Sequence, residues 1–370
     1  MFVDGACVDE VRKRFGVRDI EWRRGEGLIL NGQRVEIRGC NRHESMPGHG
    51  SALPAEIHRQ DAATIKAMGL NAVRLAHYPQ SPLFLDACDE LGILVYAEIA
   101  TWKSVTTGKW LDAAERQLRG MILRDRHHPS IILWGLGNES RSRVAYERLG
   151  RIVKELDPGR CTTYAENHLY RAKREKALNL VDVWGCNYEL DVLDEVVDYC
   201  STGTAIVSEC SNSPHAERGN LPMEWDQVMR VSNDLDAIAR RPAVAGFFIW
   251  SFQDYATLRK KRYKRCCGLV DAWRHPKLAF WMLKARFGDE PVVKIAAERT
   301  RNEGGTTLTV YWISTEPVAQ LRLDGRLLAE RTGPVLEMIT LQDDGEELVA
   351  LGLSGDRRTE DRLTVGRPHS

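Results

Sequence analysis

Short apolar runs alternate with longer amphipathic stretches through most of the chain. A buried strand often reads as a brief apolar run, and strand signals lie at residues 35–39, 72–75, 94–98, 131–135, 161–164, 182–187, 204–208 and 245–250. The stretches between them carry helix signals, such as Ser81-Pro82 at a helix start and Gly92 at its end. Eight strand–helix pairs within residues 35–290 predict an α/β fold, a (β/α)8 TIM barrel. A doubly wound open sheet is the alternative, but no glycine-rich phosphate-binding fingerprint follows any of the runs.

Both flanks of this region have the character of β structure. Asn31-Gly32 between two apolar runs is a hairpin signal, and a hairpin buries no core of its own. We therefore expect the short N-terminal β segment, residues 1–34, to lean on the barrel or to be the tail of another domain. Residues 291–355 contain short apolar strands and a turn at Asp324-Gly325, which predict a small C-terminal β-sandwich. Residues 356–370 are charged and are predicted to form a loose tail.

Composition narrows the class of partner and the compartment. The 370 residues include 52 Lys and Arg and 52 Asp and Glu, so the net charge is zero. Without a basic stripe or a long apolar run, we expect no nucleic acid and no membrane as partners. The chain starts without a signal-peptide pattern, and its nine cysteines lack a C-x-x-C spacing. These features predict a cytoplasmic protein with reduced thiols, no zinc and a neutral or mildly polar small-molecule partner; a homo-oligomer stays open.

Candidate chemistry lies at the ends of two predicted strands. The run at 131–135 leads through Gly137 and Asn138 to Glu139, and the run at 204–208 leads directly to Glu209. The carboxyl ends of barrel strands carry the active site in this fold. Cleavage of a glycosidic bond needs one carboxyl group as acid and another as nucleophile or base. The alternative, that each glutamate is a solvated loop charge, weakens because the two occupy matching positions.

Four stretches resemble the sequence motifs of glycoside hydrolase family 2. Residues 39–50 carry G-C-N-R-H-E with a later proline and glycine, and residues 71–79 carry N-A-V-R followed by H-Y-P. Residues 84–92 are similar to the helix that follows in the family, and residues 124–140 resemble its acid/base signature. The four stretches occur in the family order. The resemblance spans about residues 1–355 and makes residues 1–34 the end of an immunoglobulin-like domain.

The resemblance implies a retaining β-glycosidase and assigns roles to residues. Members include β-galactosidases, β-glucuronidases and β-mannosidases, and no cofactor is expected. Glu139 would be the acid/base and Glu209 the nucleophile, at the 5–5.5 Å spacing usual for retaining pairs. Asn138 would bind the sugar's 2-hydroxyl, and Arg74 would keep Glu209 ionised.

The other assignments are less specific. His43 and His77 would bind sugar hydroxyls, and Glu98 would either bind a hydroxyl or support a residue that does. Tyr188 would donate a hydrogen bond to the nucleophile, and Trp250 would form a platform beneath the sugar.

Departures from the family pattern bear on metal and specificity. Some β-galactosidases carry a Glu-x-His magnesium pair, and the matching positions are Trp102 and Ser104, so we expect no metal. Residues 265–268 lack the Asn-x-Lys motif of β-glucuronidases, although residues 260–265 are basic. That basic run would face an acidic sugar or be a solvated loop. Cys210 and Asn212 also depart from residues common after the nucleophile.

We expect the family's N-terminal sugar-binding domain to be missing, and this leaves two classes of function to compare. The first hypothesis is a retaining β-glycosidase of galactosidase type, whose substrate is a small glycoside or oligosaccharide. The alternatives are β-glucuronidase-type specificity, or a catalytically weak carbohydrate-binding fragment of a longer enzyme. The presence of both carboxylates favours the enzyme.

Overall fold

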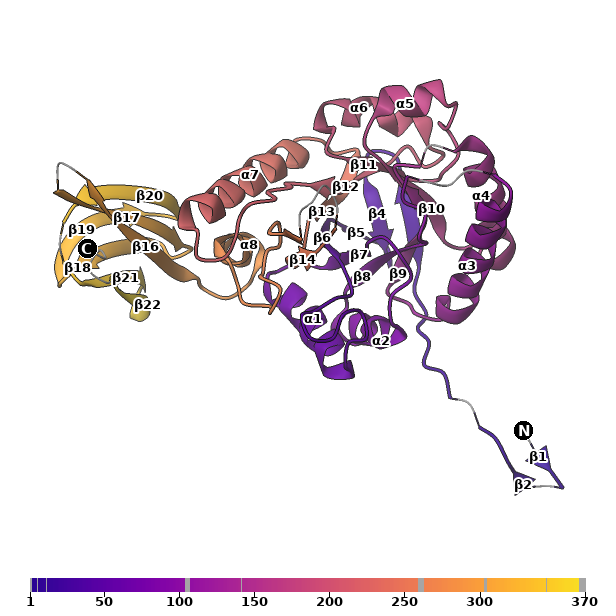
Figure 1. Cartoon of the computed structure of the whole chain (residues 1–370), viewed down its shortest axis with the longest axis horizontal. Helices are drawn as coiled ribbons and strands as arrows, with labels where there is room; N and C mark the ends of the chain where they lie inside the picture. The colour runs from indigo at the N-terminus through magenta and orange to yellow at the C-terminus, as the bar shows by residue number, and fades with distance from the viewer. Residues whose placement is uncertain are drawn as a thin grey trace. The chain divides into compact units, whose positions relative to one another are not determined.

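In the computed structural model of the chain, eight strands close into a parallel barrel. Helices lie around this barrel (Figure 1). The structure describes residues 2–4, 6–10, 12–103, 107–140, 142–258, 263–302, 305–343 and 345–365. Around the barrel the strands follow the order β10-β11-β12-β13-β6-β7-β8-β9. They are β6 (Ile37–Arg42), β7 (Ala72–Leu75), β8 (Leu94–Glu98), β9 (Ile131–Asn138), β10 (Cys161–Glu166), β11 (Trp184–Asn187), β12 (Ala205–Cys210) and β13 (Val244–Ile249). The TIM barrel predicted from the sequence is confirmed.

All eight strands lie where the apolar runs predict them, but several extend further. β9 continues to Asn138 and β12 to Cys210, each beyond the apolar run that predicts it. Their polar ends are buried, with Asn138 2% and Glu209 4% exposed. Gly135 permits this in β9, because a Cβ there would lie 2.4 Å from the Cβ of Glu98 on the neighbouring strand. The candidate polar residues therefore stand on rigid strand ends.

The helices have the local signals that the sequence predicts. Helix α2 begins after Ser81, whose side chain accepts a hydrogen bond from Leu83 N (3.2 Å), and it ends at Gly92 in the left-handed region. The helices are α1 (Ala55–Ala67), α2 (Pro82–Leu91), α3 (Lys109–Asp125), α4 (Arg143–Leu156), α5 (Leu169–Arg174), α6 (Leu193–Val196), α7 (Leu221–Ala239) and α8 (Leu278–Phe287), with short 3₁₀ turns at Leu190–Val192 and Val197–Tyr199. No helix in the described ranges is both long and apolar enough to cross a membrane.

The chain divides into two compact units. The first comprises Met1–Gly39, Ala72–Glu209 and Ile238–Phe248. Its core joins the barrel strands to an N-terminal sheet of β3 (Ile20–Arg23), β4 (Gly27–Leu30) and β5 (Gln33–Val35). Trp22 and Leu28 of this sheet pack in one cluster with strand residues such as Ile132. The predicted hairpin is confirmed, and it leans on the barrel because that contact buries its apolar face.

Short strands of two residues lie outside these sheets. β1 (Phe2–Val3) pairs antiparallel with β2 (Ala6–Cys7), and β14 (Tyr255–Ala256) pairs antiparallel with β15 (Lys264–Arg265). The descent of residues 1–34 from an immunoglobulin-like domain stays a prediction.

The second unit comprises Cys40–Asn71, Cys210–Ala237 and Ile249–Ser370 and contains the C-terminal sandwich. One sheet has the order β16-β17-β20 and the other β19-β18-β21-β22. Alternating apolar residues such as Trp312 and Leu321 form the core. The strands are β16 (Val293–Asn302), β17 (Gly305–Ser314), β18 (Val318–Leu323), β19 (Arg326–Thr332), β20 (Val335–Gln342), β21 (Glu347–Ser354) and β22 (Arg357–Thr364).

The expectation of a loose tail from residue 356 is wrong for Arg357–Thr364. These residues form β22, which pairs antiparallel with β21 along its whole length. Their charges face solvent in alternation with half-buried positions, which is the pattern of an edge strand with one solvated face. Charge therefore marked an exposed face here, not disorder. Residues 366–370 lie outside the described residues.

Candidate active site

Arg74, at the end of β7, gathers the strand-end residues that the sequence singles out. Its Nε donates to Glu98 Oε2 (2.9 Å), its Nη1 to Glu209 Oε1 (2.8 Å) and its Nη2 to Asn138 Oδ1 (2.8 Å). These partners come from β8, β12 and β9. Arg74 is fully buried, and its guanidinium lies 5.0 Å from the centre of the Tyr96 ring. One guanidinium therefore fixes two carboxylates and an amide at one end of the barrel.

The charges of this cluster stabilise one another. Burial alone lowers the pKa of Arg74, but Glu98 and Glu209 outweigh burial and raise that pKa above its ordinary value. Burial likewise raises the pKa of Glu98, and Arg74 and His77 outweigh it, so the pKa lies below its usual range. Glu98 is thus ionised at neutral pH.

Glu209 has further partners that orient its carboxylate. The Tyr188 hydroxyl donates to Oε2 (2.6 Å), while Arg74 occupies Oε1. Tyr188 adopts a left-handed φ of 66°, and its backbone N donates to Glu209 O (2.8 Å). His77 Nδ1 donates to Glu98 Oε1 (2.6 Å), and its Nε2 lies 3.8 Å from Glu209 Oε1. The structure therefore brings together Arg74, His77, Glu98, Tyr188 and Glu209.

Two polar residues that the sequence analysis missed complete the same cluster. Asn187 Nδ2 donates to Asn138 Oδ1 (3.0 Å), and the Ser208 hydroxyl donates to Asn187 Oδ1 (2.7 Å). Because Asn138 Oδ1 accepts from Arg74 as well, its amide is oriented with Nδ2 as a donor. Asn187 ends β11, so the signal that found Glu139, a polar residue closing an apolar run, also marks Asn187.

Glu139 follows β9 and has a different neighbour. It is 7% exposed, adopts a left-handed φ of 51°, and donates its backbone N to Ala165 O (2.7 Å). Its Oε2 lies 2.8 Å from Lys103 Nζ. Lys103 belongs to the loop after β8, and nothing in the local pattern marks a single loop lysine as a partner of a strand-end carboxylate.

His43 and Trp250 lie in the second unit and contact each other. The His43 ring meets the Trp250 ring edge-on at 5.3 Å and lies 4.4 Å from the Tyr255 ring. Trp250 directly follows β13 and is 5% exposed, and Gln253 Nε2 donates to His43 O. The sugar-binding roles assigned to His43 and Trp250 stay predictions.

Arg265, from the predicted basic run, also lies in the second unit. It pairs in register with Tyr255, and its Nη2 donates to Asn212 Oδ1 (3.0 Å). Its buried Nε has no hydrogen-bond partner, and its guanidinium has no acidic partner within the described part of the chain. Lys264 differs, because it pairs with Glu217. Residues 259–262 of the run lie outside the described residues.

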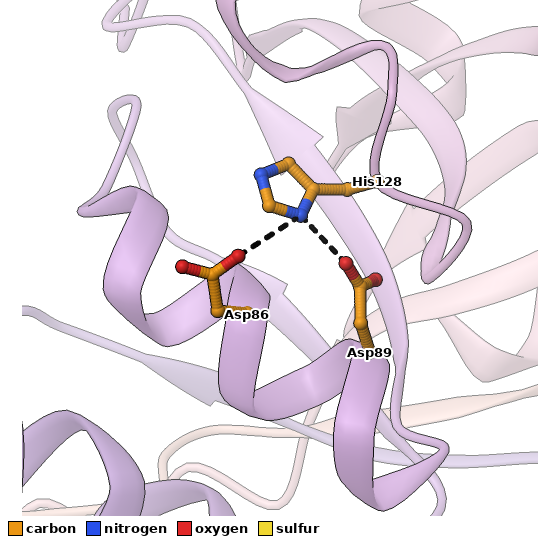
Figure 2. A group of neighbouring side chains, drawn as sticks. All are labelled: Asp86, Asp89 and His128. Atoms are coloured by element: carbon orange, nitrogen blue, oxygen red, sulfur yellow. Dashed lines mark hydrogen bonds and ion pairs between the residues drawn. The ribbon is translucent and has the colours of Figure 1, made fainter. Parts of the chain in front are cut away.

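A separate group, Asp86, Asp89 and His128, has the composition of a metal site, but its hydrogen bonds have a structural role. Figure 2 shows His128 with its Nδ1 directed at Asp89 Oδ2 (2.7 Å) and Asp86 Oδ1 (3.9 Å). Asp89 also accepts from Ser130 N (3.0 Å), and the hydrogen bonds of His128 and Ser130 outweigh burial and lower the pKa of Asp89. These bonds tie α2 to the turn that precedes β9.

The residues beside Glu139 do not fit the magnesium pair of some family members. Trp102 offers an indole, which does not ligate a hard cation, and it lies parallel to His77 at 6.3 Å. The ammonium group of Lys103 stands at the carboxylate that such a cation would share. Ser104 lies outside the described residues.

A closed (β/α)8 barrel with carboxylates at the ends of its strands is an architecture found among glycoside hydrolases. Residues 22–290 match the family model "Glycosyl hydrolases family 2, TIM barrel domain". The chain belongs to this family, which confirms the resemblance found in its sequence.

Relatives with two specificities match the chain. A β-galactosidase of Thermoanaerobacterium thermosulfurigenes is 33% identical over 307 residues, which cover 80% of this chain and 43% of the relative. A β-glucuronidase of Bacteroides fragilis is 28% identical over 403 residues, covering 98% of this chain and 58% of the relative. The structure of Bacteroides uniformis β-glucuronidase 2, covalently bound to cyclophellitol-6-carboxylate aziridine, superposes with a TM-score of 0.82 at 25% identity, covering 95% of this chain and 48% of that one. The chain thus spans about half the length of these relatives.

Proposed function

We propose that the chain is a retaining β-glycosidase that removes a terminal β-linked sugar through a covalent glycosyl-enzyme. The observation that carries the proposal is the state of Glu209: it is nearly buried, and separate donors, Arg74 and Tyr188, hold its two oxygens. A carboxylate whose two oxygens are held and aimed in this way has the properties of a nucleophile. A covalently bound inhibitor in a β-glucuronidase relative supports the same two-step chemistry.

In the first step, a Glu209 oxygen attacks the anomeric carbon while the bond to the leaving oxygen breaks. Glu139, as the protonated acid, transfers its proton to that oxygen. Asn138 Nδ2, oriented by the bonds to its Oδ1, would donate to the sugar's 2-hydroxyl. This hydrogen bond strengthens toward the transition state.

In the second step, water attacks the anomeric carbon and displaces Glu209 as a carboxylate. Glu139, now ionised, takes the proton from that water, which restores both groups. Arg74 and Tyr188 stabilise the charge that returns to Glu209 as the bond breaks.

We propose galactosidase-type specificity as the first candidate. The β-galactosidase relative shows the higher identity of the two curated relatives, and the stretch 265–268 lacks the Asn-x-Lys motif. One observation favours the second candidate, a β-glucuronidase: Arg265 lacks an acidic partner in the described residues, and a guanidinium fork suits the carboxylate of an acidic sugar.

A panel of 4-nitrophenyl β-glycosides tests the proposal and separates the candidates. We expect turnover of the galactoside; preferential turnover of the glucuronide would establish the second candidate. Calorimetric binding of the same sugars runs in parallel, because binding without turnover would identify a carbohydrate-binding fragment instead. Glu209→Gln is assayed on the same panel and should be inactive. Its matched control is Glu147→Gln on α4, because Glu147 forms an exposed ion pair with Arg143 (2.7 Å).

A further inference from the structure

The loop after β8 presents Lys103 to Glu139 with a geometry fixed by the main chain. Lys103 N donates to Asn138 O (3.1 Å), and Asn138 N donates to Thr101 O (3.3 Å). Main-chain hydrogen bonds therefore connect the loop to the end of β9. Lys103 and Glu139 both adopt left-handed φ angles, 60° and 51°, which non-glycine residues seldom do. Such conformations persist where surrounding bonds hold them. Here they bring Nζ to 2.8 Å from Oε2.

Aromatic contacts also hold the side chain of Lys103 in place. Its Nζ lies 5.1 Å from the centre of the Trp102 ring, within reach of a cation–π interaction. Trp102 stacks on His77, and His77 donates to Glu98 within the Arg74 cluster. The Lys103 side chain is 39% exposed and that of Glu139 only 8%. The ammonium is therefore a tethered group, unlike a lysine on a solvated face.

We propose that Lys103 is a positioning residue that acts through Glu139 and favours the second half of the reaction. This inference rests on the proposed glycosidase function. In that half, the ionised Glu139 accepts a proton from water while the water oxygen bonds to the anomeric carbon and the bond to Glu209 breaks. A fixed ammonium at 2.8 Å stabilises the carboxylate and holds it in one orientation.

The same ammonium opposes the first half of the reaction. There Glu139 must be the neutral acid, which offers the ammonium group no charge to pair with. Removal of Lys103 should therefore slow the second step and leave the first step unchanged or faster for a leaving group that needs protonation. A merely structural role for Lys103 would impair both steps together.

Two rates separate these possibilities in Lys103→Met. Reactivation of the trapped 2-deoxy-2-fluoroglycosyl-enzyme reports the second step, and kcat/KM for the methyl glycoside of the sugar that the wild type hydrolyses reports the first. We expect reactivation to fall by roughly fivefold, the size of a partly exposed ion pair, while kcat/KM stays the same or rises. Lys103→Arg should restore reactivation. Lys154→Met is the matched control, because Lys154 forms an ion pair of the same 2.8 Å length with Asp182 on the outer surface.

Equal losses in both rates, or no change in either, would overturn the role of Lys103. Thermal unfolding of each variant checks that the fold is intact, and Lys103→Gln replaces Lys103→Met if the methionine variant unfolds early. A wild type that hydrolyses none of the glycosides would refute the glycosidase proposal and this inference with it. An active wild type with unaffected Lys103 variants would refute this inference alone.

Discussion

Two arginines stand at the ends of barrel strands, and both are fully buried, yet their surroundings differ. Arg74 on β7 binds two carboxylates, Glu98 and Glu209. Arg42 on β6 instead shares one carboxylate, Asp61, with a second arginine, Arg274.

The two carboxylates differ in how completely their oxygens are occupied and shielded from solvent. Both oxygens of Asp61 accept from guanidinium groups, and its side chain is 0% exposed. The side chain of Glu209 is 5% exposed, and its neighbours Tyr188 and His77 reach solvent. A buried, paired charge is therefore no mark of function by itself. We expect the network of Asp61, Arg42 and Arg274 to stabilise the fold, whereas the Glu209 network is proposed as a reaction centre. Substitution of Asp61 should therefore lower stability, and substitution of Glu209 should lower activity.

The largest effect is expected for Glu209→Gln. Without the nucleophile, kcat should fall on the order of 10⁴-fold, because no covalent intermediate can form. Thermal unfolding should change little, since Arg74 keeps its bonds to Glu98 and Asn138. Steady-state kinetics and a melting curve on the same preparation check this. More than about one per cent of wild-type activity, after exclusion of wild-type contamination, would argue against the nucleophile assignment.

Glu139→Gln should have a smaller effect that depends on the leaving group. Loss of general acid catalysis costs about 10²–10⁴-fold for a leaving group that needs protonation. A dinitrophenolate departs without a proton, so the first step should persist, and azide should rescue turnover by attacking the glycosyl-enzyme. A variant that loses both kinds of substrate alike, without azide rescue, would show that Glu139 is not the acid/base.

Sequence reasoning reached the barrel and the Arg74 cluster for an identifiable reason. Period, turn residues and polar residues closing apolar runs are local signals, so Glu139 and Glu209 were found from their strands. The roles of Arg74 and Asn138 came from the resemblance to the family. Lys103 was missed because its partner lies 36 residues away in the chain, and only the folded loop brings them together. The strand β22 was missed because its charges hide the alternation of a half-buried edge strand.

Asp61→Asn should instead reduce stability. Two guanidinium groups would face an amide in place of a buried carboxylate, which should lower the free energy of unfolding by about 3–5 kcal/mol. Urea unfolding measures this, and activity per folded molecule should stay near that of the wild type. Asp198→Asn, which removes an exposed ion pair to Arg24, is the control and should cost less than about 1 kcal/mol. Equal losses of unfolding free energy in the two variants would contradict a stabilising role for the Asp61 network.

His58 should make stability depend on pH in the same region. Burial, followed by the charge of Arg42, lowers the pKa of His58 to about 4, and Arg42 Nη2 faces its Nδ1 (3.3 Å). The unfolded chain binds a proton below about pH 6.5 and the folded chain does not. The contribution of His58 to the free energy of unfolding is therefore fully present above pH 6.5. It falls by about 3 kcal/mol as the pH drops to 4. His58→Gln should flatten the unfolding free energy against pH relative to the wild type, and parallel curves would contradict this.

Chelation should have the smallest effect of all, namely none. Trp102 offers no ligand to a hard cation, and Lys103 occupies the carboxylate that a cation would need. Turnover should survive exhaustive treatment with EDTA. Activity that disappears in EDTA and returns with magnesium would mean that other residues supply the ligands.

Covalent labelling tests the central claim, that Glu209 is the nucleophile of a retaining glycosidase. The chain is incubated with a 2-deoxy-2-fluoro-β-glycoside of the sugar it hydrolyses, and the intact mass and the labelled peptide are measured. We predict one added sugar, attached to the peptide that contains Glu209, and none in Glu209→Gln. Turnover without any adduct, or a label on Glu139 or another residue, would contradict the account.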